Sequence, residues 1–141
     1  MNYLEWQFAD NAIVQLTHQT TADNNARWVH GWFDNANDLL KAGRMLSGKG
    51  NLFISLHRPH DRKVSNKVDS STGFKNDDIE RYTRIFIDLD PARDGYIASS
   101  QFELNLALER QWYAIQFFCG LGWANPARGM SGNGAHLIFR T

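Results

Sequence analysis

Short apolar runs divided by polar turns dominate the first half of the chain and predict strands with one helix. Strands are predicted at residues 12–16, 28–33 and 52–56, where β-branched and aromatic side chains gather. A helix is predicted to begin after Asp34 as its N-cap, since leucines recur there at helical spacing until the glycines at 48 and 50. The first half therefore has the pattern of a sheet with a helix packed on it.

The second half begins with the apolar run at residues 85–89, which predicts another strand. Ser100 and Glu103 have capping-box spacing, so a helix of about twenty residues is predicted from there to the glycines at 120 and 122. One side of that helix is expected to face the core, through Phe102, Leu106, Ile115 and Phe118. A glycine-rich loop at 129–135 then leads into a predicted strand at 136–140.

Residues 57–81 are mainly polar and have no clear period, so a long loop is predicted. The basic residues Arg58, Arg62, Lys63 and Lys67 lie in its first half, and an acidic segment at 77–80 follows. Two interpretations remain open: a solvated loop, or a mobile basic strip that meets phosphates.

Composition favours one globular domain over residues 1–141, because 43% of the residues are hydrophobic. A net charge of zero argues against binding nucleic acid by bulk electrostatics alone. The single cysteine, Cys119, excludes an internal disulfide and a cysteine-rich zinc site. No apolar run approaches the ~20 residues of a membrane span and no signal-peptide pattern is present, so a cytoplasmic protein with no membrane partner is expected.

Asp88 and Asp90 are the first candidates for chemistry, because they interrupt an otherwise apolar strand. Side chains at i and i+2 of a strand share a face about 6–7 Å apart, so the two carboxylates could converge on one hard cation. Pro91 ends the strand directly after them. Solvated or turn-capping carboxylates are the alternative. A calcium loop of the EF-hand type is excluded, since Arg93 and Ser99 occupy its glycine and final glutamate positions.

His136 is the second candidate, because it opens a strand directly after the glycine-rich loop. Such a loop lets backbone N–H groups approach an anion, and the imidazole could donate to phosphate or transfer a proton. The loop lacks the third glycine of a dinucleotide fingerprint, since Leu137 stands there, and it is not a nucleophile elbow, since Asn133 follows Gly132. A hydrogen-bonded structural histidine is the alternative.

Together these motifs resemble the archaeo-eukaryotic primase superfamily, in particular the primase-polymerase domains of phages and plasmids. Asp88 and Asp90 match its paired aspartates, and Gly134-Ala135-His136 matches its motif of a small residue, any residue and histidine. The resemblance is strongest over residues 84–140, including Arg93, and is weaker in the first half.

This resemblance implies an α+β fold with an RRM-like catalytic core, in which a mixed or antiparallel sheet carries packed helices. It implies that Asp88 and Asp90 bind Mg²⁺ or Mn²⁺, and that Ser131, Gly134, His136 and Arg93 hold a nucleotide. The implied activity is template-dependent nucleotidyl transfer, by a DNA primase or polymerase, in replication of a phage, plasmid or other mobile element. Nucleoside triphosphates, single-stranded or primed DNA and a helicase domain or protein are the implied partners.

The family also has a third carboxylate motif downstream of its histidine, and this chain ends at Thr141 without one. The chain is therefore expected to be the front portion of such a domain, with an incomplete core and little or no activity alone. Two alternatives remain open. One is a metal-dependent nuclease or replication initiator on a similar fold, and the other is a non-catalytic nucleic-acid-binding remnant.

Overall fold

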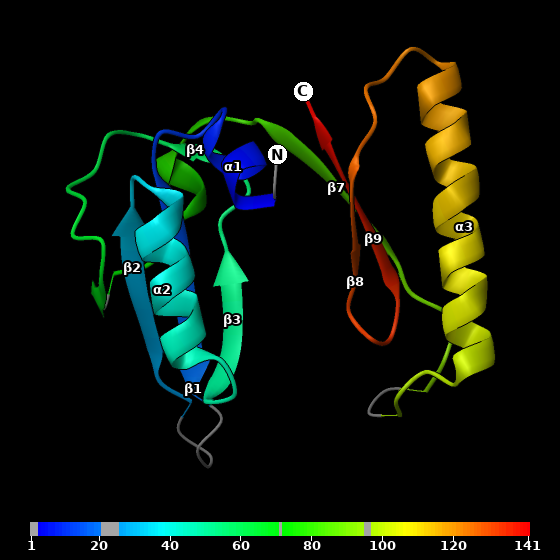
Figure 1. Cartoon of the computed structure of the whole chain (residues 1–141), viewed down its shortest axis with the longest axis horizontal. Helices are drawn as coiled ribbons and strands as arrows, with labels where there is room; N and C mark the ends of the chain where they lie inside the picture. Colours follow the sequence, from blue (N-terminus) through cyan, green and yellow to red (C-terminus); the bar gives the residue numbers. More distant parts are fainter. Residues whose placement is uncertain (1–2, 21–25, 71, 95–96) are drawn as a thin grey trace. The chain divides into compact units, whose positions relative to one another are not determined.

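The computed structural model describes residues 3–20, 26–70, 72–94 and 97–141 (Figure 1). By its internal contacts the chain divides into two compact units, Met1–Thr83 and Arg84–Thr141. Both units combine helices with antiparallel strands, so the predicted α+β class is confirmed. That the two units form a single domain stays a prediction, and each unit is described by itself.

The first unit consists of a four-stranded sheet, a two-stranded sheet and short helices. Its elements are α1 (Tyr3–Phe8), β1 (Val14–Thr20), β2 (Trp28–Phe33), α2 (Ala36–Leu46), β3 (Gly50–Ile54), β4 (Arg58–Pro59), β5 (Val68–Ser70), a 3₁₀ turn (Asn76–Asp78) and β6 (Ile79–Arg81). The larger sheet has the order β3-β1-β2-β5, and β4 pairs with β6. Val14, Leu16, Phe33 and Leu39 form the buried core between this sheet and α2.

The strand predicted at 28–33 is confirmed, while those predicted at 12–16 and 52–56 begin two residues later and two residues earlier. The prediction of Asp34 as the helix N-cap is wrong by one residue. Asn35 is the N-cap, and its side-chain oxygen accepts a hydrogen bond from the Asp38 amide at 2.9 Å. Asp34 instead accepts a hydrogen bond from the side chain of Asn66 at 2.9 Å, which lowers the pKa of the Asp34 carboxyl.

The predicted loop at 57–81 is wrong in part, because β4, β5 and β6 lie within it. Arg58 forms an ion pair with Glu80 at 2.7 Å, and Arg62 forms one with Asp78. Hydrophobic periodicity does not predict these strands, because they are only two or three residues long and depend on ion pairs and on pairing with other strands. Two of the four basic residues in the first half of this segment, Arg58 and Arg62, are thus paired with the acidic residues that follow.

Two glycines of the first unit give opposite expectations for alanine substitution. Gly43 lies inside α2, and a Cβ added there would meet open space, so Gly43→Ala is expected to stabilise by about 0.5–1 kcal/mol. A Cβ on Gly31 would overlap the carbonyl oxygen of Lys67, so Gly31→Ala is expected to destabilise by about 2 kcal/mol or more. Urea melts of both variants measure the change in the free energy of unfolding. Equal changes in the two variants would contradict the packing of the segment at Lys67 against β2.

His30 predicts that stability depends on pH. Burial lowers the pKa of its imidazole below 6.5, and its Nδ1 lies 2.9 Å from the Thr17 hydroxyl. The unfolded chain therefore binds the proton more readily, so this contribution to stability is present above about pH 6.5 and is lost as pH falls below it. We expect a lower melting temperature at pH 5.5 than at pH 7.5. His30→Gln should reduce that difference, and an unchanged difference would contradict the assignment.

The second unit is a three-stranded antiparallel sheet with one long helix. Its elements are β7 (Arg84–Leu89), α3 (Gln101–Gly120), β8 (Ala127–Met130) and β9 (Ala135–Arg140), in the sheet order β7-β9-β8. Ile115, Leu137 and Phe139 form its buried core, with Ile87 and Leu89 packed against it. The capping box is confirmed: Ser100 caps α3, and its hydrogen bonds to Glu103 lower the pKa of that carboxyl.

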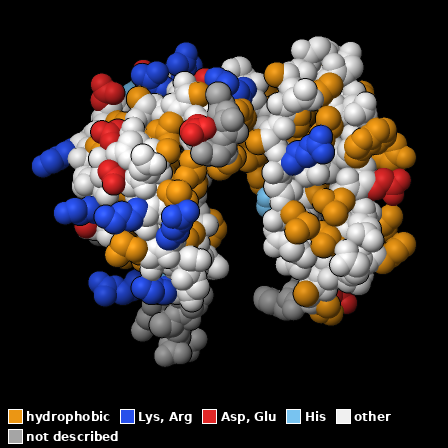
Figure 2. Space-filling model, viewed as in Figure 1, with side chains coloured by type: hydrophobic (Ala, Val, Ile, Leu, Met, Phe, Trp, Pro, Cys, Tyr) orange, Lys and Arg blue, Asp and Glu red, His pale blue; other side chains and the backbone are white. Residues whose placement is uncertain are grey.

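The predicted core stripe of α3 is half wrong. Ile115 and Phe118 belong to the core, but Phe102 and Leu106 are 70% and 42% exposed. At 3.6 residues per turn, Ile115 lies about 220° around the helix from Phe102, so the four residues do not share a side. Figure 2 shows hydrophobic side chains on the surface of this unit. Within the described residues, no helix is long and apolar enough to cross a membrane.

Candidate functional site

Strand β7 places Asp88 on the face of the sheet opposite the core. Ile87 and Leu89 pack into the core, so the alternation of the strand points Asp88 away from it, with half of its side chain exposed. The strand ends at Leu89, which leaves Asp90 and Pro91 just beyond its last residue. The prediction that both aspartates lie in the strand, with Pro91 ending it directly after them, is wrong by one residue, because only Asp88 lies within β7.

His136 lies directly across from Asp88. The antiparallel register pairs these two residues, and His136 Nε2 lies 3.1 Å from Asp88 Oδ1. The imidazole also contacts the ring of Phe86, with centroids 5.1 Å apart. Asp88 and His136 are far apart in the sequence, so pairing of β7 with β9 brings the two sequence motifs together.

Gly134 makes the close approach to Asp90 possible. A Cβ at Gly134 would overlap Asp90 Oδ1 and would lie 2.9 Å from the carbonyl oxygen of Leu89. Because a real Cβ cannot lie that close to an oxygen, residue 134 must be glycine if Asp90 keeps this position. Asp88 and Asp90 thus lie against the last and the first residue of the motif Gly134-Ala135-His136.

Ser131 shapes the turn that precedes His136. Its hydroxyl accepts hydrogen bonds from the backbone N–H groups of Asn133 and Gly134 at 3.2 and 3.0 Å. Its own N–H donates to the carbonyl of Gly134 at 3.1 Å, and Gly132 adopts a left-handed φ of 90°. In this conformation the two N–H groups are bound to Ser131. Its predicted role in nucleotide binding stays a prediction.

The sequence reasoning missed two residues that support this turn. Asn133 receives hydrogen bonds from the Ser99 N–H at 3.1 Å and the Ser99 hydroxyl at 2.6 Å, which link the turn to the start of α3. Gln111 is buried and donates to the carbonyls of Gly129 and His136 at 3.1 and 2.8 Å. A signal for Gln111 was present, since it lies four residues from both Ala107 and Ile115 on the buried side of α3.

Arg93 is occupied within its own loop. Its guanidinium donates to the carbonyl of Ile97 at 2.5 Å and contributes, as a minor cause, to the lowered pKa of Glu103. In the described part of the chain, no hydrogen bond or ion pair joins it to Asp88 or His136. Its assignment to nucleotide binding therefore stays a prediction.

A pocket of about 370 Å³ lies beside Asp90. Leu89 and Pro91 line it from the end of β7, and Glu103 and Arg110 line it from α3. It gives Asp90 a neighbouring hollow with charged groups of both signs, while Asp88 does not line it. The hollow is large enough for a small polar group beside the Asp90 carboxylate.

The described residues contain no cluster of three or more His, Cys, Asp or Glu side chains grouped closely enough to hold a metal ion. Asp88 is hydrogen-bonded to His136, while Asp90 lies against Gly134. The carboxylate oxygens suit Mg²⁺ or Mn²⁺ by their chemistry. A shared cation therefore requires that the two side chains rotate toward each other.

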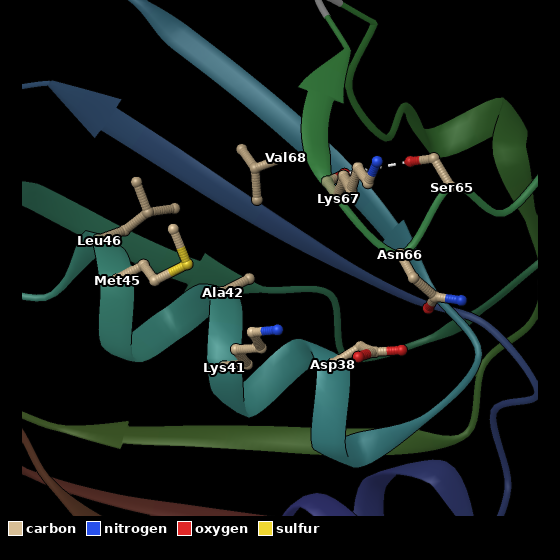
Figure 3. A pocket seen from close by; sticks show the side chains of 9 residues that line it. All are labelled: Asp38, Lys41, Ala42, Met45, Leu46, Ser65, Asn66, Lys67 and Val68. Atoms are coloured by element: carbon tan, nitrogen blue, oxygen red, sulfur yellow. Dashed lines mark hydrogen bonds between the residues drawn. The ribbon is translucent and has the colours of Figure 1, made fainter.

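A second hollow, of about 520 Å³, lies in the first unit between α2 and the segment before β5 (Figure 3). Ala42, Met45, Leu46 and Val68 give it a mainly aliphatic lining, with Lys41 among the charged residues at its edge. This lining differs from the carboxylate and imidazole groups of the site on β7 and β9. Nothing in the sequence reasoning predicted it.

Comparisons of the chain with protein-family models, with curated proteins and with solved structures found no match.

Proposed function

We propose that the second unit carries a divalent-metal site for nucleoside triphosphates, and that the chain serves template-dependent nucleotidyl transfer of the primase-polymerase kind. The observation that carries the proposal is the register of β7 on β9. It places Asp88 against His136 and Asp90 against Gly134, so the acids and the glycine-rich motif meet on one edge. Single-stranded or primed DNA is the proposed template, and a helicase is a proposed partner in replication of a mobile element.

Asp88 and Asp90 are proposed to hold Mg²⁺ or Mn²⁺. Half of the Asp88 side chain is exposed, so a cation can reach it without opening the core. A bound cation would reduce the charge barrier to attack on the triphosphate by a 3′-hydroxyl. The carboxylates supply oxygen ligands of the type that both ions prefer.

His136 is proposed to hold the phosphates. Its Nε2 lies at the open face beside Asp88, and contact with Phe86 helps to fix the orientation of the ring. An imidazole N–H that donates to Asp88 in the free protein can donate to a phosphate oxygen once the carboxylate engages a cation. In the free protein, His136 and Asp88 would thus satisfy each other through this hydrogen bond until a cation and a phosphate replace it.

The test is binding of a fluorescent nucleoside triphosphate, followed by anisotropy with Mn²⁺ and with EDTA. We expect saturable binding that requires Mn²⁺. Incorporation into a primed oligonucleotide is measured alongside, and any incorporation should also require the metal and Asp90. Triphosphate binding that is equal in EDTA, or no binding at millimolar Mn²⁺, would overturn the proposal.

A further inference from the structure

The larger sheet of the first unit has an open patch on the face opposite α2. Leu52 and Ile54 of β3 pack toward the core beneath α2, so Phe53 between them points to the other face. Trp28 lies on that same face, because its ring stacks on Phe53 with centroids 5.8 Å apart and planes 30° apart. The two rings are 50% and 48% exposed, so each keeps a free π surface.

Amide side chains lie beside the two rings. Gln19 of β1 pairs with both Trp28 and Asn51, so it lies in the row between β2 and β3. The Asn51 amide donates to the Gln19 side-chain oxygen at 3.2 Å, and Asn51 is exposed. The patch thus combines stacking surface with groups that can hydrogen-bond the edge of a nucleic-acid base.

Positive charge lies one row further along the sheet. The Arg27 carbonyl accepts a hydrogen bond from the Thr20 N–H at 3.0 Å, and the Arg27 N–H donates one to the Thr20 hydroxyl at 3.1 Å. On its other side, Thr20 pairs with Gly50. Lys49 directly precedes Gly50, and the side chains of Arg27 and Lys49 are exposed. By the alternation of the strand, the Arg27 side chain begins on the face opposite Trp28, so Arg27 and Lys49 lie at the end of the sheet and not on the patch itself. Long, flexible side chains at that end can meet the phosphates of a strand that runs off the patch.

The patch has a definite limit along the strand. Further along β2, Gly73 lies against the His30 ring, and Trp32 is covered by Phe74 and by the Arg62 guanidinium, 5.0 Å from its ring centroid. Trp32 is accordingly only 6% exposed. The open platform therefore fits one or two bases.

We propose that Trp28 and Phe53, with Gln19 and Asn51 beside them and the cations Arg27 and Lys49 at the end of the sheet, form a stacking platform for single-stranded nucleic acid. Aromatic rings beside cations suit this partner, because every base has a π face and every linkage carries a negative phosphate. The platform does not depend on nucleotidyl transfer, since its residues lie in the other unit.

The experiment measures binding of a fluorescein-labelled oligothymidylate by anisotropy, in EDTA and without nucleotides. We expect Phe53→Leu, which keeps most of the apolar volume, and Trp28→Ala each to weaken binding by about tenfold. Lys49→Gln should weaken binding less and reduce its salt dependence. Phe102→Ala removes a comparably exposed ring in the second unit, and Lys41→Gln removes a charge from α2; both should leave affinity unchanged.

Three outcomes would overturn the platform. They are full affinity in Phe53→Leu with an unchanged melting temperature, equal affinity for duplex DNA, and self-association of the parent that Trp28→Ala abolishes. Asp88→Asn separates this proposal from the proposed function. It should bind the oligonucleotide like the parent, whereas Phe53→Leu should keep Mn²⁺-dependent triphosphate binding.

Discussion

Asp88→Asn and Asp90→Asn are each expected to weaken Mn²⁺-dependent triphosphate binding by about 100-fold. Each substitution removes a negative oxygen ligand, and a hydrogen-bonded charge in such a site contributes about 1.5–3 kcal/mol. Melting temperature without metal should change little, because Asp88 is half exposed and its ion pair with His136 is therefore weak. Anisotropy titrations with the labelled triphosphate measure the loss.

Asp94→Asn is the matched control for the acidic pair, since Asp94 is an exposed acid a few residues further along the chain. It should keep the affinity of the parent. Losses of equal size in Asp94→Asn and Asp88→Asn would mean that net charge, and not a metal site, sets the affinity. A large fall in the melting temperature of metal-free Asp88→Asn would show instead that Asp88 is a structural ion-pair residue.

His136→Ala is expected to weaken triphosphate binding by about 10- to 100-fold, because one charge-assisted hydrogen bond to phosphate is lost. Its free energy of unfolding should fall by about 1 kcal/mol or less, since the imidazole lies on the open face of the sheet. Isothermal titration and urea melts on the same samples measure both quantities. The metal response of the melting temperature should persist in this variant.

His136→Gln keeps a side-chain donor and should recover part of the affinity that His136→Ala loses. His60→Ala provides the control, because His60 is an exposed histidine in the first unit. If His136→Ala unfolds, and binding falls only in proportion to the folded fraction, then His136 has the structural role that the sequence left open.

Local features of the fold were predictable from the sequence because short-range chemistry fixes them. Ser100 and Glu103 satisfy the first turn of α3 by themselves, and the β-branched and aromatic run at 28–33 forms β2 at the predicted residues. The N-cap of α2 shows the limit of such reasoning. Asp34 and Asn35 are equally good caps locally, and the contact between Asp34 and the distant Asn66 decides between them.

The candidate site divides in the same way. Alternation along the strand was sufficient to predict that Asp88 and its neighbours Ile87 and Leu89 face opposite sides. The pairing of Asp88 with His136 depends on the register of two distant strands, which periodicity does not supply. Gln111 and Asn133 were missed because their role is to bind backbone groups of other elements.

Paramagnetic broadening by Mn²⁺ in amide spectra of the ¹⁵N-labelled chain tests the metal site most directly. Substoichiometric Mn²⁺ is predicted to broaden first the signals of residues 88–90 and 134–136, and Asp88→Asn should remove this selectivity. Added Mg²⁺ should restore the signals by competition. Uniform broadening across exposed acids, or broadening of 88–90 that survives in the Asp88→Asn and Asp90→Asn variants, would contradict a metal site on this edge of the sheet.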